Sequence, residues 1–164
     1  MLLLGDKQSS TLTRPLVALR DTVVFPGLNI PLSIGRAKSI AAVEAAGHQN
    51  YEVIFVTQKN NEAEDPDLRE VYEVGTLARI NQILRTPTGH LPVQAEGRER
   101  VRLRRFVKTD PYPLVEAMTI AEPIEQTTEL EAIRRAILSA FQQLMSLTKV
   151  VPMELVLGIF TNPN

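Results

Sequence analysis

Cysteine and tryptophan are both absent from this sequence of 164 residues, and histidine occurs only at His48 and His90. The absence of cysteine excludes disulfides, thiol catalysis and every zinc site that uses a cysteine ligand. Two histidines are too few for a multi-histidine zinc site. Aromatic residues account for 5% of the chain, so a platform of rings for stacking bases or sugars is not expected either.

The sequence also lacks an excess of charge and a long hydrophobic run. Its 18 basic residues nearly cancel its 19 acidic ones, so the protein has no overall field that would concentrate polyanions. The apolar N-terminus, Met1–Leu4, is too short for a secretory signal, and no later run approaches the roughly 18 residues of a membrane span. The composition is that of a globular protein, which we expect to be cytoplasmic and to bind no membrane.

Sequence motifs for enzyme chemistry are absent as well. The eight glycines form neither the phosphate-binding pattern G-x-x-x-x-G-K-[ST] nor the dinucleotide pattern G-x-G-x-x-G. No serine lies in a G-x-S-x-G elbow, and the acidic residues between Gln58 and Glu70 lack the spacing of a calcium-binding loop. We therefore expect these residues to include no catalytic, cofactor-binding or metal-binding site.

The spacing of apolar residues divides the chain into three parts. Residues 1–14 are polar and patternless after Leu4, which predicts a flexible leader. Residues 15–122 alternate short apolar runs with turn residues, which predicts a β-rich domain with one short helix. Residues 123–164 have helical spacing and predict the start of a helical bundle, which we expect to be truncated at Asn164. The expected fold class is therefore α+β.

Runs rich in β-branched and apolar residues mark the expected strands. These runs are 15–19, 22–25, 29–34, 52–57, 74–84, 91–96, 98–107 and 112–120. The first two form either two short strands or an extended segment, and the dipeptide Pro26-Gly27 that follows is a turn signal. Pro31 cannot donate a hydrogen bond within a sheet, so the third run is expected at a sheet edge or a bulge.

Two segments have the three- and four-residue spacing of helices. The first begins near Arg36 and is stopped by Gly47 at a C′ position. The residues expected on its inner face are Ala37, Ile40, Ala41 and Val43. The second helix runs from a capping box at 128–131 to about Leu147, and a further short helix is expected at 153–160.

Three arginines, Arg100, Arg102 and Arg104, alternate with Val101 and Leu103 and so share one face of an expected strand. A row of guanidinium groups can hold phosphate, which leaves a nucleic-acid-binding module as one hypothesis. The competing interpretation is a solvated strand face whose arginines pair with acids on neighbouring strands. We favour the second, because no aromatic residue interleaves with the arginines and the overall charge is not basic.

Four apolar residues close to predicted turns form the candidate substrate-binding set. They are Leu19, Phe25, Leu28 and Pro31. Where proline-rich strand ends bring such side chains close to loops, some stay exposed and form a patch that can hold an apolar peptide. For each residue taken singly, burial in the core is the alternative.

Six short blocks of the sequence carry a family resemblance. In chain order they are LRDTVVFP (19–26), IPL (30–32), GRAKSI (35–40), VGT (74–76), PTG (87–89) and EGRERV (96–101). On these blocks the chain resembles, from residue 15 to residue 160, the N-terminal domain of the ATP-dependent Lon protease. It departs from the usual pattern of that family at Ala18, at Thr88 and within 92–95.

The resemblance implies a PUA-like β pseudo-barrel with one packed helix, followed by a truncated helical subdomain. It also implies a non-catalytic domain that recognises unfolded, misfolded or degron-bearing proteins for a serine protease. The ATPase domain, with its ATP and Mg, and the Ser-Lys protease domain would lie beyond Asn164 in a hexameric parent. Besides nucleic-acid binding, an oligomerisation domain that self-associates is a further alternative.

Overall fold

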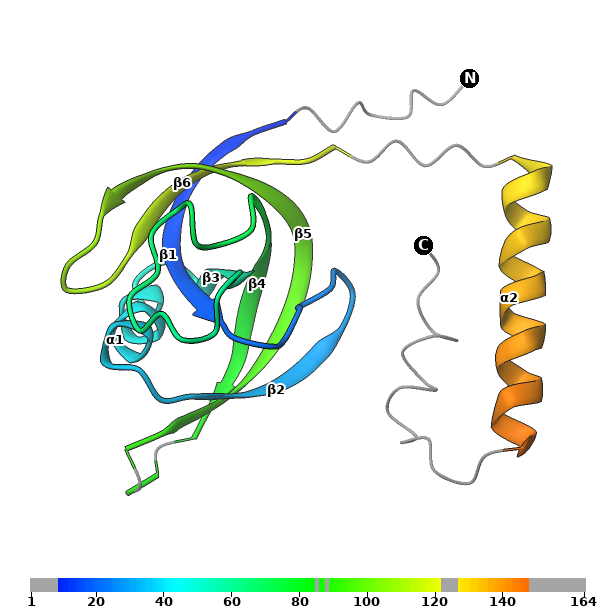
Figure 1. Ribbon diagram of the computed structural model, residues 1–164, viewed down its shortest axis with the longest axis horizontal. Helices are drawn as coiled ribbons and strands as arrows, with labels where there is room; N and C mark the ends of the chain where they lie inside the picture. The colour runs from blue at the N-terminus through cyan, green and yellow to red at the C-terminus, as the bar shows by residue number, and fades with distance from the viewer. Residues whose placement is uncertain (1–8, 85, 88, 122–126, 148–164) are drawn as a thin grey trace. The chain divides into compact units, whose positions relative to one another are not determined.

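The computed structural model describes residues 9–84, 86–87, 89–121 and 127–147. The chain consists of two units, Met1–Ala121 and Glu122–Asn164, which we call the β unit and the helical unit. The β unit carries every described strand and the helix α1, whereas the helical unit carries the helix α2 (Figure 1).

The strands of the β unit form one six-stranded sheet that closes on itself (Figure 1). They are β1 (Thr11–Leu19), β2 (Asn29–Ile34), β3 (Glu52–Thr57), β4 (Val74–Ile83), β5 (Leu91–Lys108) and β6 (Leu114–Thr119). Their order is β2-β5-β4-β3-β1-β6, with a further pairing between β5 and β6. Neighbours run antiparallel except for β1 and β3, which are parallel. The pairing of β5 with β6 confirms the expected pseudo-barrel.

Strand β5 makes this closure possible because it is 18 residues long and strongly curved (Figure 1). Its first part, from Leu91, pairs with β2, and its second part, from Val101, pairs with β6. The runs 91–96 and 98–107, which the sequence suggested as separate strands, are one strand. Gly97 continues the ladder between them, because it pairs with Ala78 of β4.

Two apolar clusters fill the two faces of the sheet. Along β1, Val17 belongs to the cluster under α1, whereas its neighbour Leu16 belongs to the other. Along β3, Phe55 belongs to the cluster under α1, and its neighbour Ile54 belongs to the other cluster. Because side chains alternate between faces along a strand, β1 and β3 read as continuous apolar runs when both faces are buried.

Strand β1 begins at Thr11, inside the segment predicted as a flexible leader. Residues Thr11 to Pro15 pair with β6, and the guanidinium of Arg14 lies 2.8 Å from the carboxylate of Glu52. The leader prediction is therefore wrong for residues 11–14. All of these residues except Leu12 are polar, and their order comes from a partner strand far along the chain, which a local pattern does not reveal.

Helix α1 (Ala37–Ala46) packs on the sheet against β1 and β3. Its buried residues are Ser39, Ala42, Val43 and Ala46. The predicted inner face is correct at Val43, which is buried, and at Ile40, which is half-buried and packs against the same core cluster, but it is wrong at Ala37, which is exposed. Ala42 and Ala46 have no exposed surface, and their small side chains allow the helix to approach the sheet closely.

The end of α1 also differs from the prediction. Gly47 caps the helix with a right-handed backbone, at φ −53° and ψ −28°. The left-handed residues are Asn50 and Tyr51, at φ 56° and 59°. The chain therefore turns towards β3 three residues after Gly47, not at the glycine itself.

In the helical unit, α2 spans Thr128–Leu147. The hydroxyl oxygen of Thr127 accepts a hydrogen bond of 3.1 Å from the backbone N–H of Leu130. The N-cap is therefore Thr127, one residue before the predicted capping box, because its hydroxyl satisfies a free N–H of the first turn. No described helix is long and apolar enough to cross a membrane. The helix predicted at 153–160 lies outside the described residues.

Candidate functional site

The loop between β1 and β2 is held against the sheet by two threonine hydroxyl groups. Thr57 on β3 donates a hydrogen bond of 2.7 Å to the carbonyl oxygen of Thr22, and Thr76 on β4 donates one of 2.6 Å to that of Val24. Val24 and Thr76 are buried, so the carbonyl oxygen of Val24 depends on the hydroxyl group of Thr76 for a hydrogen bond. Residues 22–25 form no strand, so the expectation of a second short strand there is wrong. The residues on either side of Val24 have exposed side chains.

A glycine on β5 receives the end of the same loop. Gly97 donates a backbone hydrogen bond of 2.9 Å to Leu28 and accepts one of 2.8 Å from Gly27. A Cβ at Gly97 would overlap the carbonyl oxygen of Phe25 and lie 2.8 Å from its carbonyl carbon. Gly27 has φ 80°, which confirms the turn predicted at Pro26-Gly27. The close approach of loop and strand therefore requires a residue without a side chain at position 97.

Four exposed apolar side chains form what we call the apolar patch. They are Val23, Phe25, Tyr72 and Val74, which expose 54%, 58%, 53% and 38% of their surface. Val23 and Val74 line a shallow hollow of about 700 Å³ together with Tyr72, and a smaller one of about 200 Å³ together with Phe25. The shared residues make the patch continuous. Exposed apolar patches of this kind are typical of protein-interaction surfaces.

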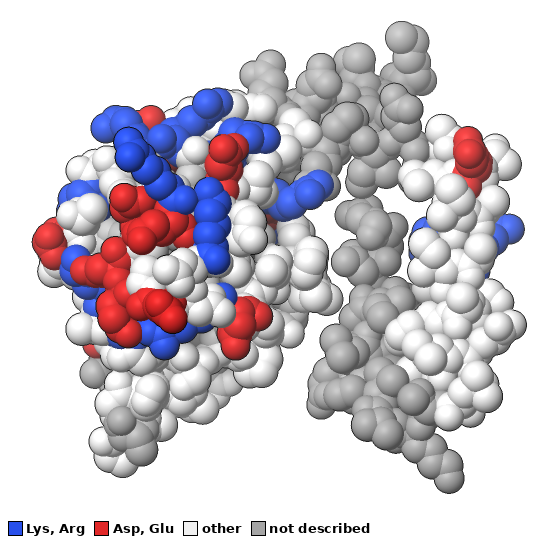
Figure 2. All heavy atoms as spheres, in the orientation of Figure 1, with Lys and Arg blue, Asp and Glu red and all other residues white. Residues whose placement is uncertain are grey.

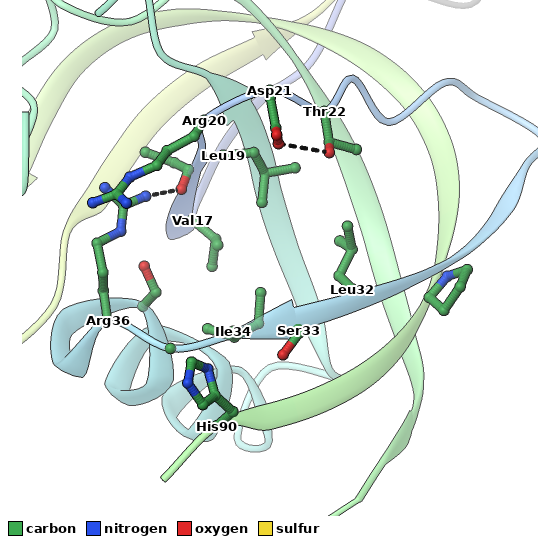
Figure 3. Close-up of a pocket in the computed structure, with 14 residues that line it drawn as sticks. Val17, Leu19, Arg20, Asp21, Thr22, Leu32, Ser33, Ile34, Arg36 and His90 are labelled. Atoms are coloured by element: carbon green, nitrogen blue, oxygen red, sulfur yellow. Dashed lines mark hydrogen bonds between the residues drawn. The ribbon is translucent and has the colours of Figure 1, made fainter. Parts of the chain in front are cut away.

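A second feature is a cleft of about 500 Å³ between the end of β1 and strand β2 (Figure 3). The side chains of Val17, Leu19, Leu32 and Ile34 point into the space between the two strands (Figure 3). Polar groups of the cleft come from Arg20, Asp21, Thr22, Arg36 and His90. The cleft thus combines an apolar interior with several polar side chains, as ligand-binding clefts commonly do.

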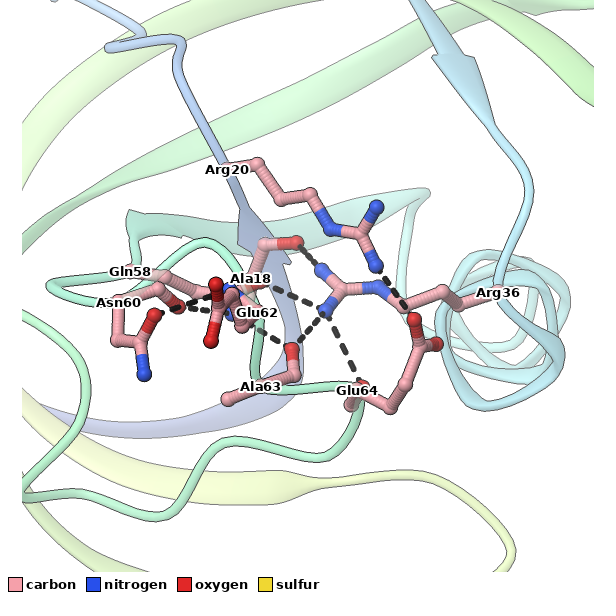
Figure 4. Close-up of polar contacts among 8 residues, drawn as sticks. All are labelled: Ala18, Arg20, Arg36, Gln58, Asn60, Glu62, Ala63 and Glu64. Carbon is pink, nitrogen blue, oxygen red and sulfur yellow. Dashed lines mark hydrogen bonds and ion pairs between the residues drawn. The ribbon is translucent and has the colours of Figure 1, made fainter.

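The guanidinium of Arg36 joins three segments at one end of this cleft (Figure 4). It donates hydrogen bonds to the carbonyl oxygen of Ala18 at the end of β1, to Oε1 of Gln58 at 2.6 Å and to the carbonyl oxygen of Glu64 at 3.2 Å. Burial lowers the pKa of Arg36, and the neighbouring Arg20 lowers it further. The group still carries its charge at neutral pH. It fixes the polar loop after β3 against the end of β1.

The four predicted substrate-binding residues do not form a single site. Leu19 and Pro31 line the cleft, whereas Leu19 and Phe25 line the smaller hollow of the apolar patch. Leu28 lines neither feature. Phe25 and Pro31 are exposed, and the other two are half-buried. Leu19 therefore lies between two adjoining surfaces that the sequence treated as one.

Sequence reasoning missed three residues of the apolar patch, Val23, Tyr72 and Val74. Val23 does carry a signal, because it lies two residues before Phe25 and alternate residues of an extended segment share a face. Tyr72 and Val74 carry none. Their position beside Val23 follows from the pairing of β3 with β4, and no local pattern specifies that pairing.

On β5, Arg102 of the predicted row and Arg105 next to it pair with acids, whereas Arg104 contacts the sulfur of Met118. Arg102 lies 3.2 Å from Glu73, and Arg105 lies 2.9 Å from Glu116. A register shift places Arg104 in a β-bulge, so the predicted regular row of three arginines is interrupted. Figure 2 shows basic and acidic side chains intermixed on the visible face of the β unit. This arrangement is the one expected of a solvated strand face.

Comparisons with known proteins connect these features to a family. Residues 13–163 match the family described as the ATP-dependent protease La (LON) substrate-binding domain. The chain belongs to this family. Its curated relatives include the Lon proteases of Azospirillum brasilense, 36% identical over 145 residues, and of Rhizobium meliloti (strain 1021), 38% identical over 144 residues. Each match covers 88% of this chain and 18% of the relative, so the chain spans less than a fifth of their length.

Two solved structures have the same fold as this Lon substrate-binding domain. The N-terminal domain of the Mycobacterium avium complex Lon protease has a TM-score of 0.60 at 20% identity, covering 83% of this chain and 71% of that one. A Lon N-terminal domain protein from Xanthomonas campestris has a TM-score of 0.59 at 18% identity, covering 81% and 75%. These likenesses establish the fold as that of Lon N-terminal domains.

Proposed function

We propose that the β unit recognises unfolded, misfolded or degron-bearing segments of other proteins for a Lon-type serine protease. The observation that supports this most directly is the apolar patch, whose side chains stay exposed on a firmly hydrogen-bonded loop and strand. An unfolded chain exposes apolar side chains that a folded protein buries. Binding would remove apolar surface of the patch and of the unfolded chain from water, so the patch would favour unfolded partners over folded ones.

In the parent protein, this domain would deliver bound segments to ATPase and Ser-Lys protease domains in the cytoplasm. ATP and Mg²⁺ would act there, and no step of the proposal depends on either. The described part of this chain holds no group of three or more His, Cys, Asp or Glu side chains suited to a metal ion. A hexamer would present one patch per subunit, and linked weak sites bind a long chain more tightly than one site does.

Fluorescence anisotropy of a labelled, permanently unfolded polypeptide, titrated with the 164-residue protein, tests the proposal. We expect saturable binding that persists at high salt, because apolar contacts are not screened by ions. A labelled DNA duplex is titrated in parallel. Binding to DNA alone, lost at high salt, would assign the function to the face of Arg100, Arg102 and Arg104. Binding to neither would contradict the proposal and favour an oligomerisation domain.

A double substitution in the apolar patch, Val23→Ser with Phe25→Ser, is expected to weaken binding of the unfolded polypeptide about tenfold. Both side chains are more than half exposed, so their loss removes contact surface and leaves the core intact. The matched control is Val107→Ser, which changes a valine that is 45% exposed on β5 and lines neither hollow of the patch. Equal affinities of the double variant and the control would show that the patch does not bind substrate.

A further inference from the structure

The outer edge of β2 has no partner strand among the described residues. β2 lies at the end of the strand order, and it pairs only with β5. An unpaired edge offers backbone N–H and C=O groups to another chain. We infer that an extended segment of a substrate protein binds by adding a strand to β2, inside the cleft between β2 and β1. This inference rests on the proposed function and assigns the cleft, which adjoins the apolar patch at Leu19, a part in holding the substrate.

The register of β2 shows which of its backbone groups are free. The N–H of Leu84, which follows β4, donates a hydrogen bond of 2.9 Å to the carbonyl oxygen of Pro92. The carbonyl group of Pro92 therefore points towards the β4 side of β5 and away from β2. Ser33 lies opposite Pro92 and therefore directs its own N–H and C=O away from β5. Backbone groups alternate in direction along a strand, so Asn29 and Pro31 face outward as well.

The outward groups of β2 suit a substrate better than a second copy of this protein. They are the carbonyl groups of Asn29, Pro31 and Ser33 and the N–H groups of Asn29 and Ser33. Pro31 supplies no N–H, so two β2 edges could not form a complete ladder with each other. A substrate strand with all of its N–H groups can still donate to every outward carbonyl of β2.

The β1 side of the cleft offers less to an added strand. The N–H of Gln58 donates a hydrogen bond of 2.7 Å to the carbonyl oxygen of Leu19, so Leu19 faces β3 and Ala18 faces the other way. The carbonyl oxygen of Ala18 already accepts a hydrogen bond from Arg36 (Figure 4). The open carbonyl groups along the cleft therefore belong to β2.

The side chains of the cleft determine the chemistry of the segment that fits. Leu32 and Ile34 of β2 point into the cleft, facing Val17 and Leu19, whereas Ser33 points away from it (Figure 3). An added strand shares the pleat of β2, so every second side chain enters the same apolar space. The segment is therefore an extended one with apolar residues at alternate positions. In a folded protein such a segment is already paired in a sheet, which restricts binding to unfolded chains.

The substitution Ser33→Pro tests strand addition on the protein side. It removes an outward N–H and no hydrogen bond to β5, as Pro31 already does two residues earlier. The probe is a labelled peptide that alternates Val and Ser over about eight residues, enough to span β2. We expect the affinity of the 164-residue protein for it to fall about tenfold, whereas Ser33→Ala, which keeps the N–H, binds as the unchanged protein does. Thermal unfolding of both variants verifies that folded proteins are compared.

Methylation of the peptide's amide nitrogens tests the same idea without altering the protein. In an extended peptide, the amides of alternate residues lie on one edge and the remaining amides lie on the other. We expect methylation of one set to weaken binding more than about tenfold and methylation of the other set to change it less than about twofold. Equal effects of the two sets, or unchanged binding by Ser33→Pro, would overturn strand addition.

The two proposals fail in distinguishable ways. If the unfolded polypeptide binds, but methylation of the alternating peptide weakens its binding equally on either edge, the proposed function stands and the strand-addition mode is wrong. If the polypeptide does not bind at all, both are wrong. If the polypeptide binds and the alternating peptide does not, the substrate chemistry assigned to the cleft is wrong, and strand addition is rejected with it.

Discussion

Replacing Gly97 by alanine is expected to lower the free energy of unfolding by about 3 kcal/mol and to weaken substrate binding. The new Cβ would overlap the carbonyl oxygen of Phe25 and come within 3.3 Å of Cα of Pro26. These are backbone atoms, so either the loop or β5 must move. Movement of the loop would displace part of the apolar patch and loosen the hydrogen bonds of Gly97 to Leu28 and Gly27. Urea unfolding and anisotropy with the unfolded polypeptide measure the two effects.

The matched control for this substitution is Gly89→Ala in the β4–β5 hairpin. Gly89 has φ 76°, so alanine there is strained, but no heavy atom lies within 4 Å of the new Cβ. We expect a loss of about 1 kcal/mol and unchanged binding of the polypeptide. A Gly97→Ala variant no less stable than Gly89→Ala would show that the loop can retreat from β5 without cost, and the proposed anchoring of the patch would be wrong.

The strands were predictable where burial itself creates the pattern. The boundaries of β3, Glu52–Thr57, match the predicted run, because the strand has four consecutive apolar residues that are buried, alternately on one face of the sheet and on the other. The beginning of β1 was not predictable. Three of the four residues from Thr11 to Arg14 are polar, and the segment forms a strand because β6 lies beside it. The spacing of apolar residues in the sequence indicates which residues are buried, but it does not indicate which distant strands pair with each other.

The candidate site was predictable only in part for the same reason. Phe25 could be identified because Pro26 and Gly27 mark the loop that exposes it, and Pro31 because a proline within a strand indicates a sheet edge, where β2 lies. The contact of Gly97 with the backbone of Phe25, and the reach of Arg36 to Gln58, join segments that are distant in sequence. The sequence identified Arg36 only as the start of a predicted helix and as part of a block typical of the family. Its role in fixing a loop is a property of the folded structure.

Replacing Arg36 by methionine is expected to lower the free energy of unfolding by about 3 kcal/mol. Methionine keeps much of the apolar stem but leaves the carbonyl oxygens of Ala18 and Glu64 and the side-chain oxygen of Gln58 without this donor. The polar loop at 59–70 would then detach more readily from the end of β1. Urea unfolding measures the loss of stability, and limited proteolysis is expected to cut first within that loop.

Arg20→Met is the matched control, because Arg20 also pairs with Glu64, at 2.6 Å, but does so on the exposed surface. An exposed ion pair contributes little, so we expect a change below about 1 kcal/mol. Equal losses for the two variants would contradict the role assigned to Arg36.

Binding of the alternating peptide to folded Arg36→Met tests whether Arg36 affects recognition as well as stability. In folded Arg36→Met the carbonyl of Ala18 faces the cleft without its partner, so strand addition gains an acceptor and the affinity for the alternating peptide should be retained or increased.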